Sequence, residues 1–357
     1  MSSTTTRQKF QRLVRWPTMR IGRGAAAVVV ALLASSCQYL PNDSQSTVVI
    51  FTTGEDSQAV IDEATALGVT TVRNSQDVSA PIRAATLAYR DAGLRLVLHA
   101  KSGPALASPP LTTDSQIADY KRQLGATLDA TEPSLLAVEN EENYTGFYTG
   151  TAAQYLRQLY AAATVAHARR IPVTNGGITS TMVALATWKD LYDRGLDAEA
   201  SDFAARAFPD EDWIRRDLAV RPFKKLSRPV AEASRQMALD LIAAFRTAPI
   251  DAVNFHWYID DDRALAQTIE YLRRATGKPV VSTEMGQYTT GQDTTDAAVV
   301  SGHLDTAIGS KHLPFLIWFD ADGTRAKGLH DPATGILRRS GTTFMTWLQT
   351  HDRLIRP

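Results

Sequence analysis

The chain has 357 residues, of which 44% are hydrophobic and 21% are charged, and its formal net charge at neutral pH is zero. This composition is ordinary for a globular protein, and the length suits one large domain or two small ones. The chain has a single cysteine, which excludes a disulfide bond within the chain and a cysteine-rich zinc site, so the fold must depend on its hydrophobic core.

The first 37 residues have the pattern of an export signal. Six basic residues and no acidic ones precede the apolar run 25–34, which at about ten residues is too short to anchor the chain across a bilayer. The sequence that follows, Ala34-Ser-Ser-Cys37, resembles a bacterial lipobox, although leucine usually stands where Ala34 does. We therefore expect residues 1–37 to be a signal peptide and Cys37 to carry a lipid that anchors the mature chain in a membrane. Plain secretion with an incidental cysteine is the alternative.

Removal of this segment changes the charge of the protein. Six of the 38 basic residues leave with it, so that 32 basic residues face 38 acidic ones and the net charge becomes −6. This charge argues against nucleic acid as a partner, because phosphate contacts need a basic face. Residues 38–46 are polar and are expected to form a tether. By resemblance to Gram-negative lipoproteins, Gln38 favours the outer over the inner membrane, so we expect an exported protein of the bacterial cell envelope.

From residue 47 onward, short β-rich runs alternate with longer amphipathic stretches. Most of the runs are continuously apolar, as expected for strands of a parallel sheet that is covered on both faces. Helical patterns lie between them, among others at 57–66, 81–92, 151–169, 229–247 and 262–276. The predicted strands are 48–53, 70–74, 94–100, 135–140, 171–175, 252–258, 279–284 and 314–319.

Eight strand–helix units in about 310 residues predict an α/β fold, a single (β/α)8 TIM barrel over residues 47–357. A doubly wound sheet is the competing fold, but residues 53–56 after the first strand lack the glycine spacing of a phosphate-binding loop. The stretch from about 179 to 230 is too long for a simple connection. We therefore expect a helical insertion between strands five and six, with one of its helices at 197–207.

Polar and aromatic residues stand at the predicted carboxyl ends of the strands, where a barrel of this kind places its catalytic groups. Glu141 and Glu284 are the most informative, because two carboxylates that a fold brings together can split a glycosidic bond. One carboxyl group donates a proton to the leaving oxygen while the other attacks the sugar carbon. In chain order the residues at the strand ends are Arg73, His99, Asn140, Glu141, Asn175, His256, Trp257, Tyr258, Glu284 and Trp318.

These residues, in this strand order, resemble the large clan of retaining (β/α)8-barrel glycoside hydrolases that includes cellulase-like and xylosidase-like families. The clan carries an Asn-Glu pair after strand four, which Asn140-Glu141 matches, and a glutamate at the end of strand seven, which Glu284 matches. The remaining matches, which include a His-x-Tyr element after strand six and a tryptophan on strand eight, are Arg73, His99, His256, Tyr258 and Trp318.

The resemblance implies an enzyme that cleaves β-glycosidic bonds of a poly- or oligosaccharide with retention of configuration. Glu141 would be the acid/base and must start the reaction protonated, which a second carboxylate nearby would favour. Glu284 would be the nucleophile and must be ionised. Hydrogen bonds from Arg73 and Tyr258 would hold it in that state.

The resemblance also implies substrate contacts. Asn140 would bond the sugar hydroxyl beside the reaction centre, a contact that strengthens in the transition state. Trp318, with Trp257 as a second candidate, would offer a flat apolar face to the sugar ring. Arg73, His99, His256 and Tyr258 complete the set of candidate substrate-binding residues.

Several alternatives stay open. Glu142 is the rival candidate for the acid, and Asn175-Gly176-Gly177 has the pattern of a tight turn and is left out of the site. The chain has no His-Glu-x-x-His pair, no Gly-x-Ser-x-Gly elbow and no Walker loop, so we expect neither a metal nor a cofactor. The competing functions are a non-catalytic glycan-binding barrel lipoprotein and a two-lobed solute-binding lipoprotein of a transporter. Which glycan and which linkage are recognised does not follow from the sequence.

Overall fold

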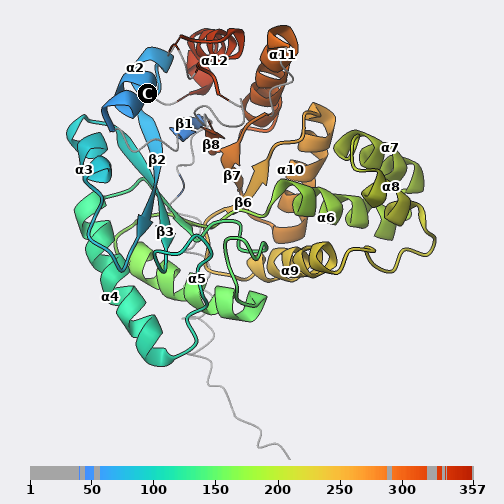
Figure 1. Cartoon of the computed structure of the whole chain (residues 1–357), viewed down its shortest axis with the longest axis horizontal. Helices are drawn as coiled ribbons and strands as arrows, with labels where there is room; N and C mark the ends of the chain where they lie inside the picture. The colour runs from blue at the N-terminus through green and yellow to red at the C-terminus, as the bar shows by residue number, and fades with distance from the viewer. Residues whose placement is uncertain are drawn as a thin grey trace, which may run out of the picture. The chain divides into compact units, whose positions relative to one another are not determined.

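Eight parallel strands form one sheet in the computed structural model, which describes residues 40, 45–51, 57–287, 292–319, 328–331, 334 and 336–355. Their order is β5-β4-β3-β2-β1-β8-β7-β6, and bridges from Thr174 to Ala252 and from Ile178 to Phe255 join the two ends of the sheet. The fold is therefore the predicted (β/α)8 barrel, seen in Figure 1, and a two-lobed binding protein is excluded. The strands are β1 (Thr47–Phe51), β2 (Thr71–Asp77), β3 (Arg95–Lys101), β4 (Leu135–Val138), β5 (Val173–Asn175), β6 (Val253–Trp257), β7 (Val280–Met285) and β8 (Phe315–Phe319).

Helices surround the sheet (Figure 1). The connection between β5 and β6 holds four of them, so the helical insertion is confirmed, and α7 has the predicted bounds, 197–207. Outside the insertion, helices α4, α11 and α12 were not predicted. Within the described residues, no helix is both long and apolar enough to cross a membrane. The helices are α2 (Ser57–Leu67), α3 (Ala84–Asp91), α4 (Asp114–Thr131), α5 (Ala152–His167), α6 (Ser180–Asp193), α7 (Asp197–Ala207), α8 (Asp212–Ala219), α9 (Pro229–Phe245), α10 (Asp262–Thr276), α11 (Asp293–Leu304), the π-helix η1 (Asp305–Ser310), α12 (Arg339–Thr350) and the 3-10 helix η2 (Asp352–Leu354).

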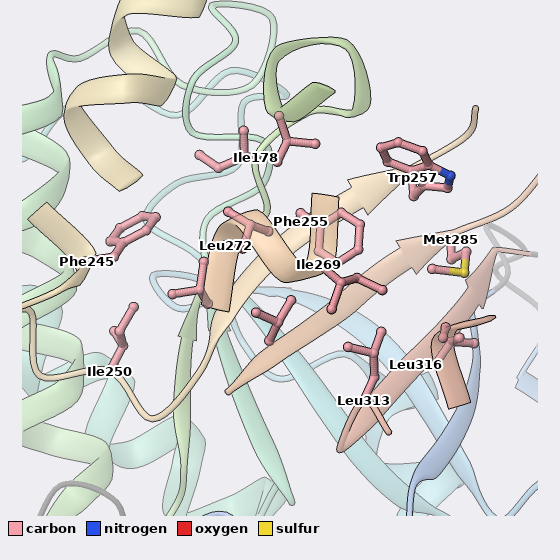
Figure 2. Close-up of a cluster of buried hydrophobic side chains, with 14 of the residues drawn as sticks. Ile178, Phe245, Ile250, Phe255, Trp257, Ile269, Leu272, Met285, Leu313 and Leu316 are labelled. Carbon is pink, nitrogen blue, oxygen red and sulfur yellow. The ribbon is translucent and has the colours of Figure 1, made fainter. Parts of the chain in front are cut away.

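Hydrophobic side chains form two clusters, one on each face of the strands. The outer cluster lies between the strands and the helices. Figure 2 shows part of it, with Phe255 of β6 and Met285 of β7 in the same cluster as Ile269 and Leu272 of α10. The inner cluster comes from strand residues, mostly in the first half of each strand, and forms the floor of the barrel below the polar strand ends. Its members are Leu40, Val49, Val97, Leu135, Ala252, Val281, Phe315 and Ile317.

Two members of the inner cluster lie outside the strands: Ala252, which directly precedes β6, and Leu40, which is far from any other member except those of β1 in the sequence. Leu40 precedes β1. It belongs to the segment 38–46 that we expected to be a polar tether, yet its side chain is buried with only 7% of its surface exposed. Gln45 and Ser46 also contact the end of the chain, because Gln45 donates to the carbonyl of Arg353 and Ser46 donates to the carbonyl of Leu354. The chain therefore contacts the floor of the barrel before β1 begins.

Strand β7 contains a one-residue bulge. On its β6 side, Asn254 pairs with Val281 and His256 pairs with Glu284. Between these two pairs β7 therefore contains one residue more than β6. Its β8 side shows the same offset between Ser282 and Met285. A bulge interrupts the alternation of side chains, and bulges are common next to active sites. Here it lets the consecutive residues Thr283 and Glu284 both contact His256.

Candidate active site

Glu141 and Glu284 come together after β4 and on β7. His256 of β6 lies between them, with Nδ1 3.0 Å from Oε1 of Glu141 and 3.7 Å from Oε2 of Glu284. One carboxylate oxygen from each glutamate and a ring nitrogen of His256 all lie within 4.8 Å of one another. The side chain of His256 is buried, whereas those of Glu141 and Glu284 are 15% and 13% exposed. Both carboxylates are therefore accessible from solvent above a buried imidazole.

Glu284 is surrounded by hydrogen-bond donors. The hydroxyl of Tyr258 donates to Oε1 at 2.5 Å, and Nη1 of Arg73 donates to Oε2 at 3.1 Å. Burial raises the pKa of Glu284, but nearby positive charge, from His256 when its ring is protonated and from Arg73, and the hydrogen bonds from Tyr258 and Arg73 outweigh it, and the pKa is lowered overall. Glu284 is thus held as a carboxylate, the form that a nucleophile requires.

Arg73 also fixes the neighbours of Glu284. Its Nη1 donates to the carbonyl oxygen of Thr283 at 2.6 Å, and its Nη2 donates to Oδ1 of Asn140 at 3.2 Å. The guanidinium therefore connects β2 to the loop after β4, which carries Glu141, and to β7, which carries Glu284. Oδ1 of Asn140 accepts the hydrogen bond from Arg73, so this bond does not use the amide NH2 group of Asn140. The NH2 group is the one that could donate to a sugar hydroxyl.

The backbone after β4 is strained where it carries the candidate acid. Glu139 and Glu141 both adopt left-handed conformations, with φ of 62° and 41°. Such conformations cost on the order of 1–3 kcal/mol each and persist where the surroundings enforce them. The buried carboxylate of Glu139 is one such restraint, because it accepts hydrogen bonds from the backbone of Ser102 at 2.8 Å and from Gln158 at 2.6 Å.

His99, which is expected to contact substrate, is the other restraint on this loop. Its side chain is buried and lies below the loop, with Nε2 hydrogen-bonded to the carbonyl oxygen of Glu139 and Nδ1 to the hydroxyl of Ser75. Burial, followed by the nearby Arg73, lowers the pKa of His99 well below its usual value, so the ring is neutral. A neutral ring donates from Nε2 and accepts at Nδ1, and both groups are then satisfied within the protein.

Trp318 is expected to stack on the sugar, but the structure places its ring away from the mouth of the barrel. Its ring is fully buried in the outer cluster, where it packs on Phe344 of α12 with the ring centroids 5.8 Å apart. Trp257 is likewise buried in that cluster (Figure 2). Side chains alternate along a strand, so the aromatic residue of β8 that faces the mouth is the next one, Phe319. It is partly exposed and packs edge-to-face on Tyr258 with the centroids 6.1 Å apart.

The turn Asn175-Gly176-Gly177, which sequence analysis left out of the site, supports both sides of it. A Cβ atom at Gly176 would overlap the carbonyl oxygen of Glu139, and one at Gly177 would overlap the ring of His256. Gly177 also has a φ of 110°, a conformation that residues with side chains rarely adopt. The two glycines let the end of β5 approach the β4 loop and the histidine closely.

We expect Gly177→Ala to displace His256 and to lower any activity of the site by tenfold or more, roughly the effect of misplacing a catalytic group by a fraction of an ångström. Gly195→Ala is the matched control, since Gly195 also has a positive φ, 73°, but open space around its Cβ position. Thermal unfolding would report the backbone strain in both variants, and activity would report the displacement in Gly177→Ala alone. Equal activities of the two variants would contradict this role.

Glu142, the rival candidate for the acid, points away from the pair. Its side chain is fully buried, and its Oε1 accepts a hydrogen bond from Nδ2 of Asn175 at 2.7 Å. Burial raises the pKa of Glu142 to about 7, against a usual value of 4.5. The carboxyl group that faces Glu284 is that of Glu141.

This burial makes a pH-dependent contribution to stability. The folded state holds the Glu142 proton up to about pH 7, whereas the unfolded state releases it near pH 4.5, so the free energy of unfolding falls as the pH rises between these values. The decline would be roughly 3 kcal/mol at most, at 1.36 kcal/mol per pKa unit. Glu142→Gln cannot titrate and should lose this decline. Urea unfolding of both proteins from pH 5 to pH 8 measures the difference, and parallel stability curves would contradict the assignment.

Glu141, His256 and Glu284 are also the group, within the described residues, whose ligand atoms are close enough to hold a metal ion. Arg73 and Tyr258 already bind both oxygens of Glu284, and a cation would have to compete with the guanidinium charge. This donor set therefore fits acid–base chemistry between two carboxyl groups better than it fits a metal centre.

Comparison with known proteins relates the chain to carbohydrate-active enzymes. Residues 221–308 match a family model described as "Glycosyl hydrolase catalytic core", and this segment includes His256, Tyr258 and Glu284. No curated protein matches the chain significantly.

Three solved structures illustrate the likeness of fold. A GH128 (subgroup II) endo-β-1,3-glucanase from Sorangium cellulosum has a TM-score of 0.53 at 16% identity, covering 84% of this chain and 97% of its own. A GH128 (subgroup VI) exo-β-1,3-glucanase from Aureobasidium namibiae has a TM-score of 0.52 at 8% identity, covering 89% and 100%. A family 39 glycoside hydrolase from Bacteroides cellulosilyticus WH2 has a TM-score of 0.53 at 14% identity, covering 85% and 63%. At these identities the structures share the barrel fold with this chain.

Proposed function

We propose that this protein is a glycoside hydrolase that cleaves β-glycosidic bonds with retention of configuration, with Glu284 as nucleophile and Glu141 as acid/base. The observation that carries the proposal is the proximity of the two carboxyl groups, which contribute oxygens within 4.8 Å of each other beside His256. Retaining enzymes hold their two carboxyl groups about 5–5.5 Å apart, whereas inverting enzymes need about 6.5–9.5 Å to admit a water. The family match over residues 221–308 supports the same class of enzyme.

The reaction proceeds in two displacements. Ionised Glu284 attacks the anomeric carbon while Glu141 donates a proton to the leaving oxygen, and a glycosyl ester forms on Glu284. Glu141, now a carboxylate, then takes a proton from water, and the water oxygen attacks the anomeric carbon and releases Glu284. Arg73 and Tyr258 favour the carboxylate form of Glu284 at the start and at the end of this cycle.

Two aromatic side chains are suited to bind the sugar. Tyr144 follows Glu141 in the same loop, where its backbone N–H donates to the carbonyl of Glu141 at 2.8 Å, and its side chain is 45% exposed. It packs edge-to-face on Phe147. Phe319 stands on the Glu284 side, next to Tyr258. Apolar ring faces on both sides of the carboxylates would bind the C–H surfaces of two neighbouring sugar units.

A panel of β-linked glycans tests the proposal directly. The structural neighbours with TM-scores above 0.5 include β-1,3-glucanases and fungal β-1,4-galactanases, so β-1,3-glucan and β-1,4-galactan are the first substrates to try. Proton NMR of the fresh product should show the β-anomer first. An α-anomer would overturn the retaining mechanism, and binding without cleavage across the panel would favour a non-catalytic glycan-binding barrel.

We further propose that the protein is exported and anchored in the cell envelope through a lipid on Cys37. The basic, then apolar, then small-residue order of residues 1–37 supports this proposal. Radiolabelled palmitate should label the expressed protein, and Cys37→Ser should abolish the label and release the protein into the soluble fraction. Labelling of Cys37→Ser would overturn the proposal.

A further inference from the structure

A chain of buried polar side chains runs beneath His256. Thr283 of β7, Asn254 of β6 and Asn175 of β5 are all fully buried, and they connect His256 to Glu142 through successive hydrogen bonds. Buried polar groups are costly unless they are satisfied, so a network of this size in a barrel interior needs an explanation.

Backbone groups fix the orientation of both amides. The N–H of Thr283 can only donate, and it donates to Oδ1 of Asn254 at 2.8 Å. The N–H of Asn254 likewise donates to Oδ1 of Asn175 at 2.7 Å. The Nδ2 of Asn254 must then be the atom that contacts the carbonyl oxygen of Asn175 at 3.0 Å and the hydroxyl of Thr283 at 2.5 Å. No flipped assignment of these amides satisfies the same partners.

This orientation determines where the hydroxyl proton of Thr283 goes. The hydroxyl has two hydrogen-bonding neighbours in the described part of the chain, Nδ2 of Asn254 and Nε2 of His256 at 3.2 Å. It accepts from Asn254, which can only donate at this atom. Its own proton is therefore available to Nε2 of His256, and an Nε2 that accepts a proton cannot carry one. The hydrogen of the neutral imidazole is then on Nδ1, which faces Glu141 at 3.0 Å.

We propose that Thr283, oriented by Asn254 and Asn175, is a positioning residue that keeps the second proton of the His256–Glu141 pair on Glu141. This inference rests on the function proposed above. The pair offers three places for two protons, namely Nδ1 and Nε2 of His256 and the carboxyl group of Glu141. With Thr283 donating to Nε2, the protons occupy Nδ1 and the carboxyl group. Oε1 of Glu141 accepts from Nδ1, so the acidic proton resides on Oε2.

The competing arrangement is an imidazolium beside an ionised Glu141, which cannot act as an acid. The negative charges of Glu141 and Glu284 favour it, and Glu142 and His99 also interact electrostatically with His256. An imidazolium would donate from Nε2 to the second lone pair of the Thr283 hydroxyl, and the buried hydroxyl proton would then have no acceptor among its two polar neighbours. The penalty for an unsatisfied buried group is large enough to shift such an equilibrium by about tenfold or more.

The protonation of His256 can be read in the resting protein. Long-range proton–nitrogen NMR of protein labelled with 15N-histidine, with the His256 signals assigned by their loss in His256→Gln, should show a proton on Nδ1 and a bare Nε2 near pH 6. A proton on Nε2, alone or together with one on Nδ1, would overturn the proposal. Because this measurement needs no substrate, it is independent of the proposed glycosidase activity.

Thr283→Val tests the consequence for the reaction. The side chain of valine can neither donate nor accept a hydrogen bond. The negative charges of Glu141 and Glu284 should then favour protonation of His256, and the imidazolium should appear in the spectrum. We expect kcat/KM to fall about tenfold or more on an unactivated glycan and to change less than about twofold on a dinitrophenyl glycoside, whose leaving group needs no acid. Thr283→Ser restores the hydroxyl and should restore the wild-type ratio of the two substrates.

The outcomes separate the two proposals. Equal losses of Thr283→Val on both substrates, or failure of Thr283→Ser to restore the ratio, would overturn the positioning role while leaving a glycosidase. A bare Nε2 in a protein that cleaves no glycan would instead support the proton arrangement and overturn the function.

Discussion

Glu284→Ala is expected to lower kcat/KM on any glycan that the protein cleaves by roughly 10⁴-fold or more, the scale of loss when a hydrolase loses its nucleophile. Glu284 sits between Arg73 and Tyr258, which hydrogen-bond its two oxygens and hold it ionised. Removal of the carboxylate leaves space beside the anomeric carbon that a small anion can enter. Added azide or formate should therefore restore turnover of an activated β-glycoside.

The product of this rescue identifies the role of Glu284. Azide attacking in place of the carboxylate inverts the anomeric centre once, so a β-glycoside should give the α-glycosyl azide. A β-glycosyl azide, or wild-type activity of Glu284→Ala without any anion, would contradict its assignment as nucleophile. Circular dichroism and thermal unfolding are needed alongside, since Arg73 loses its charge partner in this variant.

Glu141→Ala is expected to cost 10²- to 10⁴-fold in kcat/KM on glycans with poor leaving groups, the usual contribution of a general acid. The loss should be much smaller on a dinitrophenyl glycoside, whose leaving group departs unprotonated. The fall in rate on the alkaline side of the pH profile should also disappear, because no acid remains to be deprotonated. Azide should accelerate the second displacement in this variant and give the β-glycosyl azide.

Glu142→Gln is the matched control for Glu141, because the two glutamates are adjacent in sequence but face different surroundings. Glu142 is buried against Asn175, whereas Glu141 contacts His256. Steady-state kinetics with both classes of substrate should show the leaving-group dependence in Glu141→Gln and not in Glu142→Gln. The reverse pattern would make Glu142 the acid.

The fold was predictable because its pattern is periodic. Eight apolar runs separated by amphipathic stretches indicate a parallel barrel whatever the individual residues are, and the excess length at 179–230 indicates an insertion. Helix α4 was not predicted, although Thr113 and Gln116 form a capping box at its start. That signal lies in the sequence as Thr-x-x-Gln, but the helix it begins is only moderately apolar on its buried side.

The site was predictable only in part, because a strand shows one of its faces to the mouth and sequence pattern does not say which. Trp318 and Phe319 are adjacent aromatics at the end of β8, and one residue of register decides which of them faces the site. Strand β7 adds a bulge, so that Thr283 and Glu284 both face inward against the rule of alternation. Nothing in the sequence distinguishes Asn175 and Asn254 from other polar strand residues. Their hydrogen-bond partners lie on strands that are far apart in the sequence, so the network could not be predicted.

The burial of Leu40 has a consequence for what an anchored enzyme could reach. Only two residues separate it from Cys37, so a lipid on that cysteine would be tied within about 11 Å of the barrel floor, at 3.3–3.6 Å per residue. If the proposed lipid is present, a tether of this length would let the barrel rotate but would hold its floor close to the bilayer. The two carboxylates, at the opposite ends of the strands, would then face away from the lipids. An enzyme anchored in this way could reach polymer that lies above the membrane surface. The sugar headgroups of the lipids in its own membrane would lie on the opposite side of the barrel from the active site.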